Sequence, residues 1–256
     1  MPDSPYAAVK GIYFDLDDTL CGYWDASKAG LRAAFEAHPV PGVDTETAIA
    51  GWAGAFRGFA PTLKTTGLYD VYLTSGETTR TEQMRLALAS LGVEDADHAA
   101  RLSHAYMTER DRNLRLFDDA IEVLTTLKAR YPIGLITNGP ADIQRQEIAT
   151  TGIEPYLDHV FIEGEMRQGK PLKEVFDRAA AAMDLAPHQL LMVGNSFGHD
   201  ILPAIRDGWR TAWVRRDSDV PPSADVAARG AVEPIPTEGP MPDRIIGRLS
   251  ELLPLL

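Results

Sequence analysis

The sequence predicts an α/β fold, in which a helical domain is inserted into a doubly wound, mostly parallel sheet. Short apolar runs alternate along the chain with longer segments of helical period, a pattern typical of βαβ units. This alternation stops once, because residues 22–113 contain no convincing run of strand type. The chain has 256 residues, which is long enough for one large α/β domain with a smaller insertion. Of these residues 45% are hydrophobic and 24% are charged, which excludes a disordered or fibrous protein.

Five apolar runs have the length and residue types of buried strands. They cover residues 9–14, 133–136, 160–162, 190–193 and 211–214. Because parallel strands are joined by right-handed crossovers, the intervening helices are expected on both faces of the sheet. In one such helix, over residues 118–131, Ile121, Leu124 and Leu127 share an apolar face.

The insertion follows the first strand and divides the core in two. We expect a core of residues 1–21 and 114–256 and a helical domain of residues 22–113. Helical patterns within the insertion cover residues 25–38, 45–59, 82–91 and 95–112, and residues 61–77 are expected to form a loop.

The C-terminal region contains a proline-rich segment. Residues 217–242 include six prolines and predict a surface loop, with a short edge strand near Val232. A final helix is expected over residues 245–256.

Charge and cysteine content restrict the classes of partner and site. The net charge of −12 argues against nucleic acid and anionic membranes as partners. No apolar run approaches the ~18 residues of a membrane helix, and the first residues lack a signal pattern, so a cytoplasmic protein is expected. Cys21 is the single cysteine, which excludes a disulfide framework and a cysteine-based zinc site and is interpreted as a small buried hydrophobe.

Polar residues follow the predicted strands in a regular order. Asp15 and Asp17 follow the first strand and Thr137 and Asn138 the second, while Lys170 lies in a turn before the fourth. Asn195 and Asp200 follow the fourth. Each residue alone is more typical of a turn or a surface charge. Together they are expected to converge, because ligands bind outside the carboxyl ends of parallel strands.

These residue types suit phosphoryl transfer through an aspartyl intermediate. A carboxylate can attack phosphorus and divide one difficult step into two easier ones. Electrostatic repulsion opposes the attack, by about 4 kcal/mol for one like-charged pair at ~4 Å and an effective dielectric near 20. A lysine and a hard cation such as Mg²⁺ offset that repulsion, and a second carboxylate can protonate the leaving alcohol.

The motif FDLDDTL at residues 14–20 resembles the first motif of the haloacid dehalogenase superfamily in its phosphatase form. Thr137 is similar to that superfamily's second motif, Lys170 to the third, and residues 194–200 to the fourth. The insertion lies where the superfamily carries a helical cap. The resemblance therefore implies the fold described above and a cap over the strand ends.

The resemblance also implies a role for each residue. Asp15 would be the nucleophile and a Mg²⁺ ligand. Asp17 would be the general acid and base, with its backbone carbonyl on Mg²⁺. Thr137, Asn138 and Lys170 would bind the phosphate, with Lys170 also neutralising Asp15. Asn195 and Asp200 would complete the metal site. Asn195 departs from the phosphatase pattern, where Asp is usual, and so puts the metal affinity in question.

Three functions stay open at this point. We favour a Mg²⁺-dependent phosphomonoesterase that acts on a small phosphorylated metabolite, such as a sugar phosphate, phosphoglycolate or a nucleoside monophosphate. A metal-independent 2-haloacid dehalogenase is the alternative, supported by Asn195 and opposed by Asp17, since a leaving halide needs no proton. A non-catalytic binding protein is the third.

The aromatic residues of the insertion give less information. Trp24, Trp52, Phe56 and Phe59 are interpreted as helix-packing residues rather than as substrate contacts. Tyr23 and Trp24 directly follow the first motif, so they are also candidates for the mouth of the site.

Overall fold

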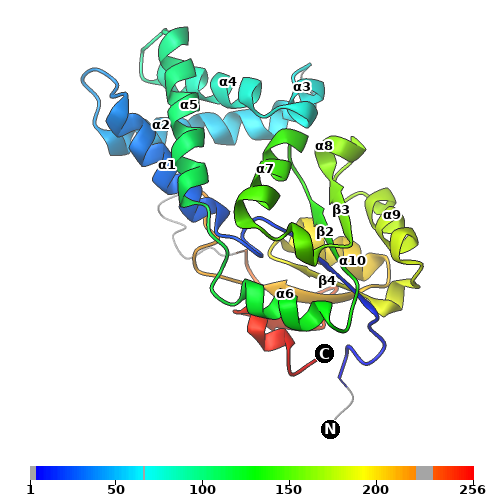
Figure 1. The fold of residues 1–256 in the computed structure, drawn as a ribbon. Helices are drawn as coiled ribbons and strands as arrows, with labels where there is room; N and C mark the ends of the chain where they lie inside the picture. Colours follow the sequence, from blue (N-terminus) through cyan, green and yellow to red (C-terminus); the bar gives the residue numbers. More distant parts are fainter. Residues whose placement is uncertain (1–3, 66, 223–232) are drawn as a thin grey trace.

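The computed structural model describes residues 4–65, 67–222 and 233–256 (Figure 1). Its centre is a six-stranded sheet with the order β3-β2-β1-β4-β5-β6, in which every neighbouring pair is parallel. The strands are β1 (Gly11–Phe14), β2 (Ile133–Thr137), β3 (His159–Ile162), β4 (Leu190–Gly194), β5 (Arg210–Val214) and β6 (Arg244–Ile246). The predicted doubly wound α/β fold is confirmed, and each of the five predicted runs overlaps a strand.

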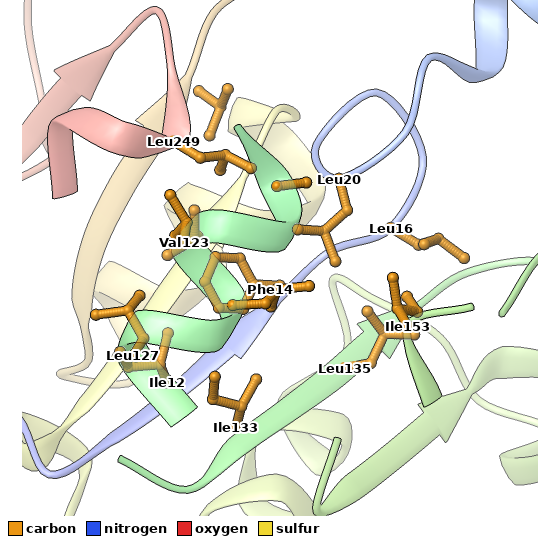
Figure 2. Close-up of a cluster of buried hydrophobic side chains, with 14 of the residues drawn as sticks. Ile12, Phe14, Leu16, Leu20, Val123, Leu127, Ile133, Leu135, Ile153 and Leu249 are labelled. Atoms are coloured by element: carbon orange, nitrogen blue, oxygen red, sulfur yellow. The ribbon is translucent and has the colours of Figure 1, made fainter. Parts of the chain in front are cut away.

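Side chains of β1 alternate between the two faces of the sheet. Ile12 and Phe14 point to one face, where α6 (Ala120–Lys128) covers them with Val123 and Leu127 (Figure 2). All four side chains are almost fully buried, and each contributes roughly 1.5–3 kcal/mol to stability through burial. This cluster fixes the central strand, and with it the position of the residues that follow β1.

The opposite face of the sheet packs against α9 (Lys173–Met183) and α10 (Leu202–Arg206). Tyr13 of β1 points to this side, and its hydroxyl donates a hydrogen bond of 2.7 Å to the carbonyl of Ala179. The Tyr13 ring lies over Gly134 of β2, where an added Cβ would lie 2.0 Å from the ring. A glycine is therefore required at that position of β2.

The segment between β1 and α6 forms a separate group of helices, which we call the helical insert (Figure 1). Its elements are α1 (Tyr23–Ala37), α2 (Thr45–Phe59), η1 (Ala60–Thr65), α3 (Tyr69–Thr74), α4 (Glu77–Ser90) and α5 (Ala96–Asn113). It has its own apolar cluster, which includes Leu31, Trp52, Met84 and Leu102. The predicted domain division at residues 22 and 113 places this group outside the core, and it stays a prediction.

The chain enters and leaves the helical insert through two paired connections. The Gly22 N–H donates to the Arg115 carbonyl at 3.0 Å, and the Phe117 N–H donates to the Leu20 carbonyl at 3.0 Å. Cys21 lies in this pair of connections and is fully buried, as expected.

The expectation of a loop over residues 61–77 is wrong. These residues contain most of η1, all of α3 and the start of α4. Both η1 and α3 have six residues, too few to show a helical period in the sequence. Buried Leu73 anchors α3, so tertiary contacts rather than local pattern produce these helices.

The expectation of a final helix over residues 245–256 is also wrong. Residues Arg244–Ile246 form β6, and Leu249–Leu252 form a single 3₁₀ turn, η6. Leu249 and Leu252 are buried in the α6 cluster, and their spacing of three suits a 3₁₀ turn as well as an α-helix. The edge strand expected near Val232 lies outside the described residues.

One residue of the helix over 118–131 was placed on the wrong face. Ile121 is 40% exposed, and Val123 occupies the buried face beside Leu124 and Leu127.

Within the described ranges, no helix has the length and apolar character needed to cross a membrane.

Candidate active site

The candidate site lies at the carboxyl ends of β1, β2 and β4. From β1 the chain goes to β2 and β3 on one side and then to β4 and β5 on the other, so the connections diverge there. Such a divergence opens a crevice outside the strand ends. A cavity of about 500 Å³ occupies it, lined by residues of both the core and the helical insert. This volume is within the range of small-molecule sites.

Asp15, Lys170 and Asp200 form a buried triad at the floor of the cavity. The Lys170 Nζ atom lies 2.6 Å from Asp15 Oδ1 and 2.6 Å from Asp200 Oδ1. Burial raises the pKa of Asp15 to about 6, and the positive charge of Lys170 opposes that shift. Burial by itself lowers the pKa of Lys170, but the two carboxylates outweigh it and raise that pKa above its ordinary value. Lys170 is therefore a charged ammonium group.

The segment that follows β4 holds Asp200 of this triad in place. The Ser196 N–H donates to Asp200 Oδ2 at 2.9 Å, and Asp200 lies in the short helical turn η4 (Phe197–Ile201). At Gly194 an added Cβ would lie 2.3 Å from Asp200 Oδ2, so only glycine lets β4 approach this carboxylate so closely. Both oxygens of Asp200 are thus used by the protein itself.

The side chain of Asn138 fixes the backbone of Lys170. Its Nδ2 donates to the Lys170 carbonyl at 2.8 Å, and its Oδ1 accepts from the Lys170 N–H at 2.8 Å. The amide expected to bind substrate is therefore occupied, and the residue acts through the position of Lys170.

Asp17 faces the cavity beside a second polar network. Gln144 of α7 (Ala141–Thr151) donates from Nε2 to Asp17 Oδ2 at 3.1 Å. The Thr137 hydroxyl donates to Gln144 Oε1 at 2.6 Å. Burial, followed by the negative charge of Asp15, raises the pKa of Asp17 to about 6. Asp17 can therefore hold a proton close to neutral pH, as a general acid must.

Behind Asp17 the network continues to a buried pair of charged residues. Gln144 Nε2 also donates to Glu147 Oε2 at 2.8 Å, and Arg110 Nη1 of α5 lies 2.8 Å from Glu147 Oε1. The two side chains are only 2% and 0% exposed. Burial and the nearby charge of Asp17 raise the pKa of Glu147 well above its ordinary value, and Arg110 opposes that rise.

Sequence reasoning missed Gln144, Glu147 and Arg110. The first two lie three positions apart on α7, on the same buried face as Ile143 and Ile148. Two polar residues at core positions of a helix that follows a site motif were the available signal, because buried polar groups need partners.

Asn195 and Thr19 lie on the other side of Asp15. The Thr19 hydroxyl is 3.1 Å from Asp15 Oδ2 and 3.3 Å from Asn195 Oδ1. Asn195 Nδ2 donates to Asp219 Oδ2 at 2.8 Å. Asp219, which the sequence did not reveal, thereby turns the amide oxygen of Asn195 towards Asp15.

This arrangement offers oxygen donors for a hard cation. Within residues 4–65, 67–222 and 233–256, no group of three or more His, Cys, Asp or Glu side chains is gathered to hold a metal ion. However, Asp15 Oδ2 and Asn195 Oδ1 meet at one hydroxyl, and Mg²⁺ needs only one or two carboxylates besides carbonyl, water and substrate oxygens. The donor set therefore fits Mg²⁺, while Asp200 lacks an unengaged oxygen for it.

The helical insert supplies the opposite wall of the cavity. Trp24, Trp52 and Phe56 line it, together with Arg80 of α4. The rings of Trp52 and Phe56 stack with centroids 5.2 Å apart, and Trp24 meets Phe56 edge-on at 6.2 Å. These three aromatic residues pack on each other, as expected, but they also face the cavity, so the interpretation as packing residues alone was incomplete.

Glu163, at the start of α8 (Glu163–Met166), connects the insert to the loop after β2. Its Oε1 accepts from the Tyr69 hydroxyl at 2.7 Å, and its Oε2 accepts from the Gly139 N–H at 3.1 Å. Lys64 lies 3.5 Å from the same carboxylate. One buried carboxylate thus joins α3 to the turn that carries Thr137 and Asn138.

Comparison with known proteins decides the family. Residues 9–206 match the family described as haloacid dehalogenase-like hydrolase. The chain belongs to the haloacid dehalogenase-like hydrolases. The predicted resemblance is therefore confirmed, and the protein is a hydrolase.

Three individual proteins illustrate this haloacid dehalogenase-like relationship. A phosphoserine phosphatase of Thermus thermophilus is 29% identical over 189 residues, which are 73% of this chain and 65% of that protein. The chain thus spans just under two thirds of that relative. The structure of the HAD-hydrolase YfnB of Bacillus subtilis, described as bound to magnesium, superposes with a TM-score of 0.69, 20% identity and coverage of 95% and 96% of the two chains.

The third is L-2-haloacid dehalogenase from Xanthobacter autotrophicus, with a TM-score of 0.67, 21% identity and coverage of 95% and 96%. At these identities the two solved structures establish the shared fold. Both phosphatases and dehalogenases therefore occur among the proteins similar to this hydrolase.

Proposed function

We propose that this hydrolase is a Mg²⁺-dependent phosphomonoesterase that acts on small organic phosphates through an aspartyl-phosphate at Asp15. The observation that carries the proposal is Asp17. It is a half-buried carboxyl group beside Asp15, held by Gln144 at 3.1 Å, and its pKa is raised to about 6. An acid poised near neutral pH is what a leaving alkoxide requires.

In the proposed first step, a carboxylate oxygen of Asp15 attacks phosphorus. The bond between phosphorus and the ester oxygen breaks, and Asp17 gives its proton to the leaving alkoxide. In the second step, the Asp17 carboxylate takes a proton from a water molecule that attacks the same phosphorus. Inorganic phosphate leaves, and the Asp15 carboxylate is restored.

Charge at the reacting phosphoryl group is offset by groups around Asp15. Lys170, with its ammonium 2.6 Å from Asp15, stabilises negative charge on the phosphoryl oxygens. Thr137 offers a hydroxyl once it turns from Gln144. When bound, Mg²⁺ would supply the remaining positive charge, and Asp15, the Asp17 carbonyl and Asn195 would hold it. Asp200 would orient Lys170.

Two features favour small substrates. The helical insert forms one wall of a cavity of about 500 Å³, which excludes a folded protein or a duplex from the strand ends. The net charge of −12 also disfavours polynucleotides.

The second candidate is a 2-haloacid dehalogenase. Asn195 favours it, because an amide in place of a carboxylate lowers the charge available to a metal. Asp17 opposes it, because halide leaves as a stable anion and needs no proton, so an acid with a raised pKa has no task in that reaction.

The deciding experiment measures phosphate release from a panel of sugar phosphates, phosphoglycolate, nucleoside monophosphates and p-nitrophenyl phosphate, with and without Mg²⁺. We expect Mg²⁺-dependent turnover of several small phosphates. The variant Asp15→Asn should lose several orders of magnitude in rate, because an amide cannot form the acyl-phosphate. Halide release from 2-chloropropionate without metal, or near-native turnover by Asp15→Asn, would contradict the proposal.

A further inference from the structure

Arg80 is a cavity-lining cation of the helical insert for which residues 4–65, 67–222 and 233–256 supply no counter-ion. It lies in the first turns of α4 and lines the same cavity as Asp15 and Lys170. Its Nε atom is buried and has no hydrogen-bond partner in the part of the chain that the structure describes. None of the ion pairs between described residues includes Arg80; the cavity-lining cations that do form such pairs are Lys170 and Arg110.

The other Lys and Arg side chains that line the cavity, among the described residues, are paired. Lys170 lies between Asp15 and Asp200, and Arg110 contacts Glu147 and Asp111 at 2.8 Å each. Within the described ranges, Arg80 therefore differs from Lys170 and Arg110 in having no carboxylate partner, although it lines the same cavity.

The nearby carboxylate of Asp142 is already engaged. It accepts from the Gly76 N–H at 3.1 Å and from its neighbour's N–H, that of Ile143, at 2.8 Å. Burial and the positive charge of Arg110 lower the pKa of Arg80, and Asp142 opposes this at longer range. The local field around Arg80 therefore favours an additional negative charge.

Backbone geometry leaves room for the guanidinium. At Gly76, which precedes α4, an added Cβ would lie 2.5 Å from Arg80 Nη1. The same Cβ would lie 2.9 Å from Ile143 and 3.3 Å from Pro140, so a side chain at this position would displace the guanidinium. The position of Arg80 thus depends on a glycine one turn earlier.

Arg80 is half-buried, and a partly desolvated guanidinium without a counter-ion is unfavourable, because arginine cannot relieve the cost by losing its proton. Such a group is stabilised when a ligand brings a carboxylate or phosphate, which guanidinium binds through two parallel hydrogen bonds. The phosphoryl group at Asp15 already has Lys170 as its cation, so the anion for Arg80 is a different group of the ligand.

We propose that Arg80 binds a second anionic group, a carboxylate or a second phosphate, at the end of the substrate remote from the phosphoryl group that is transferred. The substrate class is then an organic phosphate with two anionic ends, whose carbon skeleton contacts apolar side chains such as Trp52 and Phe56. This inference rests on the proposed phosphatase function, because it takes the Asp15 end of the cavity as the phosphoryl site.

The test uses three phosphonates that the enzyme cannot hydrolyse: propylphosphonate, 3-phosphonopropionate and propane-1,3-bisphosphonate. Their binding to the full chain with Mg²⁺ is measured by calorimetry. One charge-assisted hydrogen-bonded pair predicts that the ligands with two anionic ends bind roughly 10- to 100-fold tighter than propylphosphonate. Tighter binding of the carboxylate or of the bisphosphonate identifies the chemistry of the second anion.

The variant Arg80→Gln should reduce this preference to within about threefold, and Arg80→Lys should retain part of it, because lysine keeps the charge without the two-pronged geometry. Arg85→Gln is the matched control. Arg85 lies on the same helix, and its Nε donates to Glu82 at 2.8 Å on the surface, so the preference should not change. Arg80→Lys also provides a folded variant if Arg80→Gln is unstable.

Several results would overturn the inference. One is equal affinity of the native protein for all three phosphonates, even if p-nitrophenyl phosphate is hydrolysed, and that result leaves the phosphatase proposal intact. Another is an equal loss of affinity for all three ligands in Arg80→Gln, which would place Arg80 at the transferred phosphoryl group. Conversely, the native protein could bind the ligands with two anionic ends more tightly than propylphosphonate and yet hydrolyse no phosphate ester. That result would reject the phosphatase proposal while supporting a site for two anions.

Discussion

The two walls of the cavity are built on different principles. On the core wall, each charged side chain has a fixed partner: Lys170 lies between Asp15 and Asp200, and Asp17 is held by Gln144. On the wall of the helical insert, aromatic side chains line the cavity together with a cation, Arg80, whose Nε atom has no partner in the described part of the chain. The charged side chains of the core wall thus have partners without a ligand, whereas on the insert wall the Nε atom of Arg80 does not.

This difference separates chemistry from selectivity. Groups that must act on every substrate gain from being fixed before binding, because they then need no reorganisation in the transition state. A group that distinguishes substrates contributes most when its partner comes from the substrate alone, since a ligand without that partner leaves it unsatisfied. The following predictions test whether the core wall and the insert wall contribute independently to catalysis and to substrate selectivity.

The largest effect is expected from Asp17→Asn, which damages the core wall alone. Loss of the general acid should lower the hydrolysis rate of alkyl phosphates by roughly 10²–10⁴. The effect on p-nitrophenyl phosphate should be much smaller, because its leaving group needs little protonation. Steady-state kinetics with both substrates give the measurement, and equal losses would show that Asp17 is no proton donor.

The same residue gives the native enzyme a pH dependence of known sign. Its pKa is raised to about 6, mainly by burial. The acid form is thus present below that pH and is lost as the pH rises through it. We therefore expect single-turnover cleavage of an alkyl phosphate to slow above about pH 6, and this decline should be absent in Asp17→Asn.

An intermediate effect is expected where the two walls meet, at Arg110 of the insert and Glu147 of the core. Arg110→Met leaves Glu147 as a buried carboxylate without its partner, which costs roughly 3–5 kcal/mol. Chemical unfolding should reveal the loss, and the double variant Arg110→Met/Glu147→Leu should recover most of it. The loss should shrink as the pH is lowered, because burial raises the pKa of Glu147 above its ordinary value and the unpaired carboxylate then takes up a proton more readily.

Arg112→Met is the matched control for this measurement. Arg112 lies on the same helix and contacts Glu109 at 2.6 Å, but its side chain is 69% exposed. Exposed pairs of this kind contribute about 0–1 kcal/mol. A similar decrease in the free energy of unfolding in Arg110→Met and Arg112→Met would mean that the buried pair does not stabilise the contact between the two walls.

The smallest effect is expected from Asn195→Asp. An added carboxylate should lower the Mg²⁺ concentration for half-maximal activity, by about tenfold or less. The gain is limited because the new carboxylate would face Asp219, which now accepts a 2.8 Å hydrogen bond from the Asn195 amide. The double variant Asn195→Asp/Asp219→Asn removes that repulsion and should gain more. Identical Mg²⁺ titrations in all three proteins would place Asn195 outside the metal site.

The sequence was sufficient for the sheet and for most of the core wall. Continuous apolar runs defined five strands. Asp15, Asp17, Thr137 and Asn195 lie at the ends of these strands and Lys170 lies in a turn before the fourth, and the structure brings all five to one cavity. Such residues can be located because strand ends are marked locally and parallel sheets collect them at one edge.

The remaining residues depend on contacts between distant segments. Arg110 and Glu147 are 37 positions apart in the sequence (147 − 110 = 37) but form an ion pair. Asp219, in the loop after β5, accepts a hydrogen bond from Asn195. Arg80 is recognisable only because its Nε atom has no partner among the residues that the structure describes, which a sequence cannot show. The short helices α3 and η1 and the strand β6 were missed because tertiary packing, rather than local periodicity, forms them.

The paired connections at residues 20–22 and 115–117 have an evolutionary consequence. The chain leaves the core and returns to it at residues that are hydrogen-bonded to each other. For the sheet, the insert is therefore a closed loop, whatever helices that loop contains. The entropy of closing a loop grows slowly, by only about 0.6 kcal/mol for each doubling of its length. A lineage could thus exchange, lengthen or reshape the helices between these connections and acquire new substrates, while the sheet and its reactive carboxylates stay untouched.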